Sequence, residues 1–400
     1  MPNRCSMSFV RASASEANAM RINGTDIGVK VVERRLLHRE PYAYCAHPHL
    51  AVGRDGSFLL VFNRAPRRAV ILHPPQDPEF RNVLTVSADE GRSWSAPSVV
   101  PDYAWNGVEC AGLTALRSGR LLLNQWRFEW LPLPHAESSG RADLVMPQTL
   151  VHHLASSPEL DSFVPAGLLD AARAFPWARG GGETVVHLSD DGGRTFRRTS
   201  RIDTGPFSGG YGMRGGLELP GGDILLPLSD VAHYRAIFTV RSRDGGETWR
   251  NPALVASGQG HEFEEPAGLL LPSGRILLML RDNISRVMHS VTSDDGGESW
   301  SKPRPTGIRS YPADLVALPA GEIVCVSGQR SPPLGIVMHL SGDRGESWAS
   351  ASIPLVDELP SKDLGYPTIA RRSNGDLLVV FYARDHEGIT GIHSLTVQLS

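Results

Sequence analysis

The chain has 400 residues, of which 41% are hydrophobic and 21% are charged, and this composition excludes a largely disordered protein. Its 41 glycines and 30 prolines follow no three-residue period, so they exclude collagen and long helical bundles and predict many turns. A formal net charge of −3 gives no electrostatic reason to expect nucleic acid or an anionic membrane as a partner.

The start of the chain and its cysteines indicate the compartment. No apolar run approaches the ~18 residues that a membrane span needs, and the first residues lack the apolar core of a secretory signal. The cysteines Cys5, Cys45, Cys110 and Cys325 are scattered, so neither a disulfide framework nor a zinc site is indicated. We expect a cytoplasmic protein that uses no cofactor, with a flexible lead-in over residues 1–24.

Five segments share the pattern Ser-x-Asp-x-Gly-x-(Ser/Thr)-(Trp/Phe). They begin at Ser87, Ser189, Ser242, Ser293 and Ser341. In such a segment the Asp side chain can accept hydrogen bonds from backbone N–H groups two residues on, and the Gly supplies the positive φ of a tight turn. We expect these turns to be structural and to lie away from any chemistry.

A second pattern, which consists of a short strand, a turn with Gly and an apolar strand, occurs six times. The first residues of its copies are His47, Glu109, Arg214, Glu265, Tyr311 and Tyr366. Repeats of about 50 residues with four short strands each are typical of a β-propeller. We therefore predict an all-β, six-bladed propeller over residues 25–400. The segment 29–37 is expected to be the outer strand of the last blade and to close the ring between the N- and C-terminal parts.

The six first residues all carry side chains that ionise or form hydrogen bonds, and we expect them to ring the axis on one face. Buried ionisable groups are costly unless paired, so such a convergent set is a candidate site, with mutual polar packing as the alternative. Arg281, Arg330 and Arg384 follow the apolar strands and add cations to this face. Their planar forks suit carboxylates, which favours an anionic ligand, and inter-blade ion pairs are the alternative.

The longest connection in the predicted propeller is an insertion in blade 2 at about residues 128–185. Long loops in compact domains tend to be lids or binding loops. Residues 161–175 could form a short helix, and His152 and His153 lie side by side in the sequence. Neighbours in a strand point apart, so this pair does not indicate a metal site.

Given six blades, the repeated Asp-containing turns and the polar first residues, the chain resembles the sialidase (neuraminidase) superfamily over roughly residues 40–400. The resemblance implies an exo-acting glycosidase in which a tyrosine, paired with a glutamate, is the nucleophile. It implies that Tyr366 is this tyrosine and Glu265 its partner, with Glu264 as the alternative. It also places the acid/base aspartate of the family at Asp77, in the loop after the second strand of blade 1.

The resemblance further implies a substrate carboxylate held by three arginines. Arg281 is similar to the second of these, Arg330 lies near the third, and Arg384 is a further candidate. The other residues expected to bind the substrate are His47, His49, Glu109, Arg214 and Tyr311. Glu109 is also the alternative to Asp77 as the acid.

One departure from the family concerns the first arginine. The family opens blade 1 with an Arg-Ile-Pro motif, but here the arginine position is Ala46, and the glutamate that braces this arginine is replaced by Ala383. A hydrogen bond to a charged group contributes roughly 1.5–3 kcal/mol, so this loss weakens carboxylate binding and speaks against sialic acid itself. We expect His47 and His49 to take the place of the arginine.

Two other classes of function stay open. The first is a polysaccharide lyase that acts on uronate-containing glycans, in which a Tyr or His removes the proton beside the carboxylate. The second is a glycan-binding propeller without catalysis. Ultraviolet absorbance of an unsaturated uronate would identify the lyase, and binding without turnover would identify the binding protein. The sequence does not name the sugar, its linkage or the oligomeric state.

Overall fold

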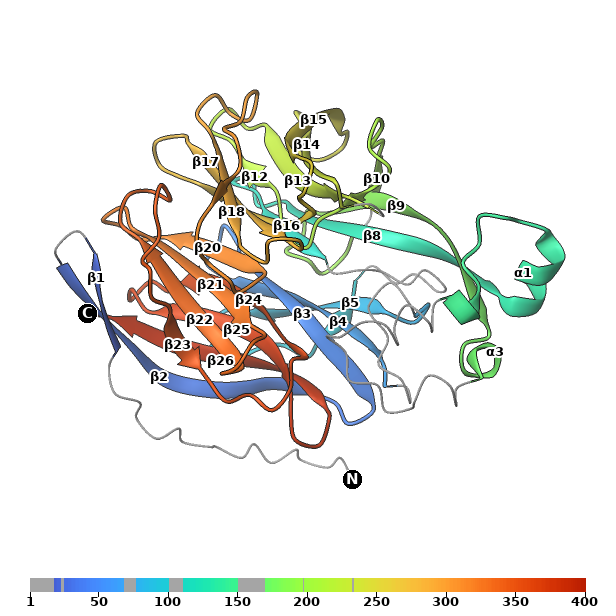
Figure 1. Cartoon of the computed structure of the whole chain (residues 1–400), viewed down its shortest axis with the longest axis horizontal. Coiled ribbons are helices and arrows are strands. Elements are labelled where there is room, and N and C mark those ends of the chain that lie inside the picture. The colour runs from blue at the N-terminus through green and yellow to red at the C-terminus, as the bar shows by residue number, and fades with distance from the viewer. Residues whose placement is uncertain are drawn as a thin grey trace.

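The computed structural model describes residues 18–22, 25–67, 77–100, 111–149, 170–196, 198–231 and 234–400. These residues form six antiparallel sheets, whose inner strands contact one another around a common axis (Figure 1). The prediction of an all-β, six-bladed propeller is confirmed. No helix in this described part of the chain is long and apolar enough to cross a membrane.

Blades 1 to 3 are built from the first half of the chain, and their strands are given from the axis outward. Blade 1 consists of β3 (Ala43–Val52), β4 (Phe58–Pro66), β5 (Arg81–Ser87) and β6 (Ser98–Val99). Blade 2 consists of β7 (Gly112–Ala115), β8 (Leu121–Pro132), β9 (Trp177–Ser189) and β10 (Arg198–Ile202). Blade 3 consists of β11 (Gly210–Tyr211) and β12 (Leu217–Glu218), both paired with β13 (Ile224–Asp230), then β14 (Ala236–Ser242) and β15 (Arg250–Ser257).

Blades 4 to 6 follow the same order. Blade 4 consists of β16 (Phe263–Leu270), β17 (Ile276–Asp282), β18 (His289–Ser293) and β19 (Arg304–Pro305). Blade 5 consists of β20 (Ala313–Ala317), β21 (Ile323–Gln329), β22 (Gly335–Ser341) and β23 (Ile353–Val356). Blade 6 consists of β24 (Leu364–Arg371), β25 (Leu377–Arg384), β26 (Thr390–Leu399), β2 (Thr25–Arg39) and β1 (Asn18–Ile22).

The ring is closed between the two ends of the chain. In blade 6, β2 pairs antiparallel with β26, with Val29 opposite Leu399 and Arg39 opposite Gly391, and the two strands lie side by side in Figure 1. The predicted closing strand, residues 29–37, lies inside β2. The pairing covers an edge of β26 that would otherwise be open to other chains. The range expected to be a lead-in, residues 1–24, includes β1, which pairs with β2.

The repeated Asp-containing turns connect the third and fourth strands of blades 1 to 5. In blade 3, Ser242 Oγ donates to Asp244 Oδ1 at 2.8 Å, and Thr248 N donates to the same oxygen at 2.9 Å. Gly246 has φ +92°, and a Cβ there would lie 2.7 Å from a methyl carbon of Leu122 in blade 2. A glycine is therefore needed both for the turn and for the close packing of neighbouring blades.

The blade 2 insertion lengthens two strands. β8 and β9 stay paired as far as Pro132 and Trp177, and this arm carries α1 (Leu133–Ser139) and α3 (Ala171–Ala174) beyond the ring (Figure 1). The flanks of the segment predicted as a loop at 128–185 are thus strands. The short helix expected within 161–175 is represented by α3. Its other residues up to 169, together with His152 and His153, lie outside the described residues.

Candidate active site

Three of the inner strands contain the same unusual backbone conformation. His47, Glu265 and Tyr366 have φ values of 52°, 52° and 47°, and each precedes a proline. The pairing register of β3, β16 and β24 shifts at these three points, which marks a β-bulge. A left-handed backbone in a bulky residue costs about 1–3 kcal/mol, and such strain is concentrated at functional sites. A bulge also turns a side chain out of the alternating pattern of its strand.

Tyr366 and Glu265 form a direct pair between blades 6 and 4. The Tyr366 hydroxyl donates to Glu265 Oε1 at 2.5 Å, and the exposed fractions of the two residues are 5% and 3%. The second carboxylate oxygen of Glu265 accepts from an Arg281 Nη1 at 3.0 Å. This carboxylate can therefore take the phenol proton while the guanidinium holds it in place.

Arg281 lies between two glutamates. Its Nε is 3.1 Å from Glu264 Oε1, and its guanidinium carbon lies 4.3 Å from the centre of the Tyr311 ring. The residue is 8% exposed. Of the two glutamates that the sequence leaves open as the partner of the tyrosine, Glu265 is the one that contacts Tyr366. Glu264 instead pairs with the other side of the arginine.

His47 contacts Tyr366 from blade 1. The two ring centres are 4.4 Å apart at an interplanar angle of 81°, which is an edge-to-face contact. His47 Nδ1 lies 3.1 Å from Asn63 Oδ1, and Asn63 Nδ2 donates to Asn82 Oδ1 at 2.8 Å. Since the Asn63 oxygen is an acceptor, His47 Nδ1 carries the proton. Two buried amides thus hold the imidazole in one tautomer and one orientation.

A buried carboxyl group that the sequence did not single out lies near His47 and Tyr366. Asp363 precedes β24, and its Oδ1 accepts from the hydroxyls of Tyr44 and Tyr382 at 3.0 Å each. Burial raises the pKa of Asp363 above its ordinary value. The hydrogen bonds and the charges of Arg330 and Arg384 act in the opposite direction but are outweighed. No repeat or motif marks Asp363 or Tyr44, and their hydrogen bond joins blade 6 to blade 1. Only the proximity of Asp363 to Tyr366 in the chain could have indicated it.

Arg330 and Arg384 surround Asp363. Arg330 Nε donates to Leu364 O at 3.1 Å, and its guanidinium carbon lies 5.4 Å from the centre of the Tyr366 ring. Arg384 N donates to Asp363 O at 3.0 Å, and its side chain is buried. Both arginines are therefore hydrogen-bonded to the backbone around the start of β24, the strand that carries Tyr366.

Two of the expected substrate-binding residues have structural contacts instead. His49 Nδ1 accepts from Leu113 N at 2.8 Å, and burial lowers its pKa to about 3, so it stays neutral and is not a switchable donor. Arg214 donates to the carbonyl oxygens of Ala313, Pro48 and Pro367 at 3.2, 3.3 and 2.8 Å. Its guanidinium group is hydrogen-bonded to the backbone of blades 5, 1 and 6, so we do not assign it to a ligand.

Of the two candidate acids, Asp77 and Glu109, Asp77 lies in the described part of the chain. Asp77 is 1% exposed, and its Oδ1 accepts from Glu79 N at 2.9 Å. Three residues further on, the ring of Phe80 lies edge-on to Tyr44 at 6.1 Å, so this end of the blade 1 loop packs beside the site. Glu109 lies outside the described residues.

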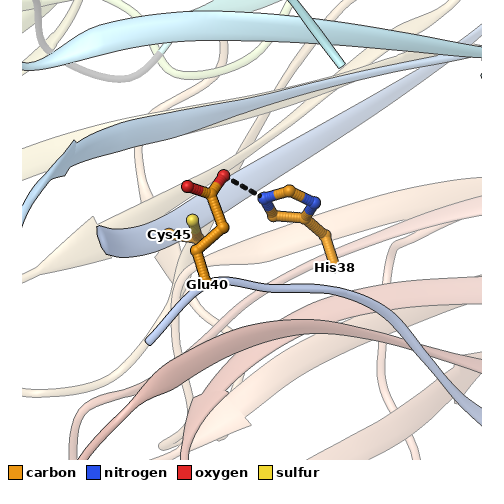
Figure 2. Close-up of side chains that lie close together, drawn as sticks. All are labelled: His38, Glu40 and Cys45. Atoms are coloured by element: carbon orange, nitrogen blue, oxygen red, sulfur yellow. Dashed lines mark hydrogen bonds and ion pairs between the residues drawn. The ribbon is translucent and has the colours of Figure 1, made fainter. Parts of the chain in front are cut away.

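Among the described residues, two groups of side chains carry atoms that could bind a metal ion, and both are engaged in other bonds. Figure 2 shows His38, Glu40 and Cys45. Glu40 accepts from His38 Nε2 at 2.8 Å and pairs with Arg64 at 2.6 Å, and burial raises the pKa of Cys45 to about 12. An arginine beside the carboxylate and a protonated thiol both disfavour a cation.

The second group of possible ligands, His261, Asp282 and His289, ties strands together. Asp282 Oδ2 accepts from His261 Nδ1 at 2.8 Å and from Ser285 Oγ at 2.6 Å. Its Oδ1 accepts from the backbone N–H groups of Glu262 and Ile284. All of these bonds hold the ends of β16 and β17 beside Arg281, and they account for the burial of the carboxylate.

Comparisons with solved structures agree with this fold. A protein of unknown function from Dyadobacter fermentans is 21% identical, and the match covers 93% of this chain and 99% of that chain with a TM-score of 0.75. An intramolecular trans-sialidase from Ruminococcus gnavus is 14% identical (89% and 94% covered, TM-score 0.61). An α-L-arabinanase from Penicillium chrysogenum is 15% identical (92% and 98% covered, TM-score 0.59). At these identities the likeness shows the fold.

No match was found among curated proteins. Residues 174–379 match the family described as a BNR repeat-like domain, which is more than half of the chain. Together with the six blades and the sialidase structures among its neighbours, this match confirms the resemblance to the sialidase superfamily in repeat and fold. The chain belongs to the BNR repeat-like domain family.

Proposed function

We propose that the protein is a glycoside hydrolase in which Tyr366 is the nucleophile and Glu265 its base. The observation that carries this proposal is the 2.5 Å hydrogen bond from the Tyr366 hydroxyl to Glu265 Oε1. Glu265 is held from its other oxygen by Arg281, and both members of the pair are kept on strained backbone. An activated nucleophile next to a positioned base is the arrangement that covalent catalysis requires.

The reaction proceeds in two displacements. Glu265 accepts the phenol proton, the Tyr366 oxygen attacks the anomeric carbon, and the bond to the leaving oxygen breaks as Asp77 donates a proton to it. Asp77, now a carboxylate, then takes a proton from water, and the hydroxide oxygen attacks the same carbon. The bond to Tyr366 breaks, and the phenolate recovers its proton from Glu265. Two displacements at one carbon retain its configuration.

The proposed substrate is a carbohydrate with an acidic group, cleaved from the end of a chain. A nucleophile that starts neutral suits an anionic sugar, because no charge repulsion opposes binding. Arg281 holds the partner of Tyr366, Arg330 lies 5.4 Å from the Tyr366 ring, and Arg384 interacts with the nearby Asp363, so we assign these three cations to the acidic group. Ala46 is 0% exposed and offers no cation from blade 1, so we expect a sugar acid other than sialic acid.

The experiment compares Tyr366→Phe with the wild type on a panel of 4-nitrophenyl glycosides of acidic and neutral sugars. We expect the wild type to release nitrophenol from at least one acidic member. Tyr366→Phe should lower kcat by at least a thousandfold, since the oxygen that forms the covalent intermediate is absent. Tyr42→Phe, at a tyrosine that is 89% exposed, is the matched control. Wild-type turnover by Tyr366→Phe would reject the role of this residue.

A polysaccharide lyase is the second candidate, and the contact of His47 with Tyr366 at 4.4 Å favours it. In such an enzyme one of these two side chains removes the proton beside a uronate carboxylate and the other gives a proton to the leaving oxygen. The two reactions differ in their products. A new absorbance of unsaturated uronate during digestion of polyuronates would identify the lyase, and reducing sugar without this absorbance would identify the hydrolase.

A further inference from the structure

Asp363 is a negative group that the proposed mechanism does not use. It is 3% exposed, and its Oδ1 accepts two hydroxyl hydrogen bonds, from Tyr44 on β3 and from Tyr382 on β25. Its Oδ2 is buried without a hydrogen-bond partner in the described part of the chain. A buried carboxylate oxygen in this situation is costly unless a cation or a proton compensates it.

The available cations are the arginines that we assign to the acidic group of the substrate. Arg330 and Arg384 both interact electrostatically with the Asp363 carboxyl. Their positions follow from two short backbone contacts, 3.1 Å from Arg330 Nε to Leu364 O and 3.0 Å from Arg384 N to Asp363 O. The rest of the surroundings is aromatic, since the rings of His47 and Tyr366 lie 5.0 and 6.1 Å from that of Tyr382.

We propose that Asp363 is a specificity-determining residue, an internal carboxylate that competes with an acidic sugar for Arg330 and Arg384 and takes up one proton when such a sugar binds. This inference rests on the proposed function, because it assumes that the sugar places its acidic group at these arginines. Two carboxylates that share the same cations repel each other, and the buried carboxylate is the one that takes up a proton and becomes neutral.

The effect has a definite direction with pH. Binding that takes up a proton weakens as the pH rises, by up to about tenfold per pH unit above the range in which free Asp363 titrates. Burial raises the pKa of Asp363 above its ordinary value, so its neutral form is reached at a higher pH than that of an exposed aspartate. The site therefore discriminates against acidic ligands at high pH and accepts them at low pH, while uncharged ligands bind equally at both.

The experiment measures affinity by NMR titration between pH 5 and 8. The probes are D-glucuronate, D-galacturonate and N-acetylneuraminate, each against its primary amide, which has the same shape without the charge. We expect at least one acid to bind the wild type with an affinity that falls as the pH rises, and its amide to show no such dependence. Equal pH dependence of acid and amide, or no binding of any acid to wild type and variants, would overturn the proposal.

Two variants identify the group that takes up the proton. Asp363→Asn keeps an oxygen for the two hydroxyls and removes the charge, so acids should bind about tenfold tighter at pH 8 and without pH dependence. Tyr44→Phe removes one hydrogen bond that favours the charged carboxyl, so it should also tighten acid binding at pH 8, by a smaller factor. This variant provides the test if Asp363→Asn does not fold. Asp343→Asn, in the blade 5 turn on the opposite face, should leave all affinities unchanged. Wild-type behaviour of both Asp363→Asn and Tyr44→Phe contradicts the proposal.

This outcome is separable from that of the proposed function. Binding and its pH dependence are measured without turnover, whereas the role of Tyr366 is measured by the release of nitrophenol. Proton-linked binding without hydrolysis would leave Asp363 its role and remove the hydrolase. Hydrolysis that requires Tyr366, with acid binding unaffected by Asp363→Asn, would support the hydrolase and remove the role of Asp363.

Discussion

Glu265 and Tyr366 lie 101 positions apart in the chain, share a left-handed backbone at φ 52° and 47°, and meet through one hydrogen bond of 2.5 Å. The two residues occupy equivalent first positions in blades 4 and 6, with blade 5 between them. The same backbone at His47 in blade 1 places its imidazole against the Tyr366 ring. A strained bulge in the inner strand thus occurs three times at residues whose side chains meet around Tyr366.

The first prediction separates the two glutamates that share Arg281. Glu265→Gln removes the group that accepts the Tyr366 proton, so kcat on the best glycoside should fall by about 10²–10⁴, the usual contribution of a general base. Glu264→Gln leaves that group in place and should lower kcat much less than Glu265→Gln does. Steady-state kinetics of the two variants side by side provide the measurement. Equal losses in both would show that the ion pair with Arg281, and not proton transfer, is what the glutamates supply.

The second prediction concerns Arg214, which joins three blades at the axis. Arg214→Met leaves three buried carbonyl groups without their donor, and each such group costs about 1–3 kcal/mol. We expect the free energy of unfolding, measured by urea denaturation, to fall by at least about 3 kcal/mol. Arg198→Met is the control, since that side chain is 62% exposed and its ion pair with Glu247 contributes less than about 1 kcal/mol. A loss at Arg214 as small as at Arg198 would show that the carbonyls find water instead.

The architecture could be predicted because it rests on repeats. The Asp-containing turns and the six strand–turn–strand segments are local patterns, and each one predicts the same blade, so a small error in one copy changes nothing. The closing strand β2 was predicted for the same reason, since blade 6 lacked one strand and only one early segment could supply it. In the site, the repeats place Tyr366 and Glu265 around the axis, whereas their pairing and the position of Arg281 were implied by the resemblance to the sialidase superfamily.

The rest of the site depends on contacts that no repeat encodes. The expectation for Arg214 came from its equivalent first position, but its neighbours at the axis are backbone carbonyls. His49 follows a bulge in β3 and turns toward blade 2, which a strict alternation of side chains does not anticipate. Asp363 and Tyr44 belong to no motif and meet only because blades 6 and 1 are adjacent in the closed ring.

The last prediction follows from histidines that the fold keeps neutral. Burial lowers the pKa of His49 and His187 to about 3 and of His339 and His393 to about 4. In the unfolded chain each of them binds a proton below about pH 6.5. The folded state therefore binds fewer protons than the unfolded state between these values. The contribution of these histidines to the free energy of unfolding is fully present above about pH 6.5. It decreases as the pH falls toward 4, by up to about 1.4 kcal/mol per pH unit for each histidine.

His187 allows this slope to be tested at one residue. Its Nε2 lies 2.9 Å from Gln125 Oε1 and its Nδ1 lies 2.7 Å from Thr199 Oγ1, so the neutral ring donates on one side and accepts on the other. His187→Gln removes one titrating group, and the fall in the free energy of unfolding between pH 6 and 4 should become shallower by about 1.4 kcal/mol per pH unit. The exposed His135 gives the matched control His135→Gln, which should keep the wild-type slope. A wild-type slope in His187→Gln would mean that this ring is protonated in the folded protein, with both nitrogens as donors and the Thr199 hydroxyl turned to accept.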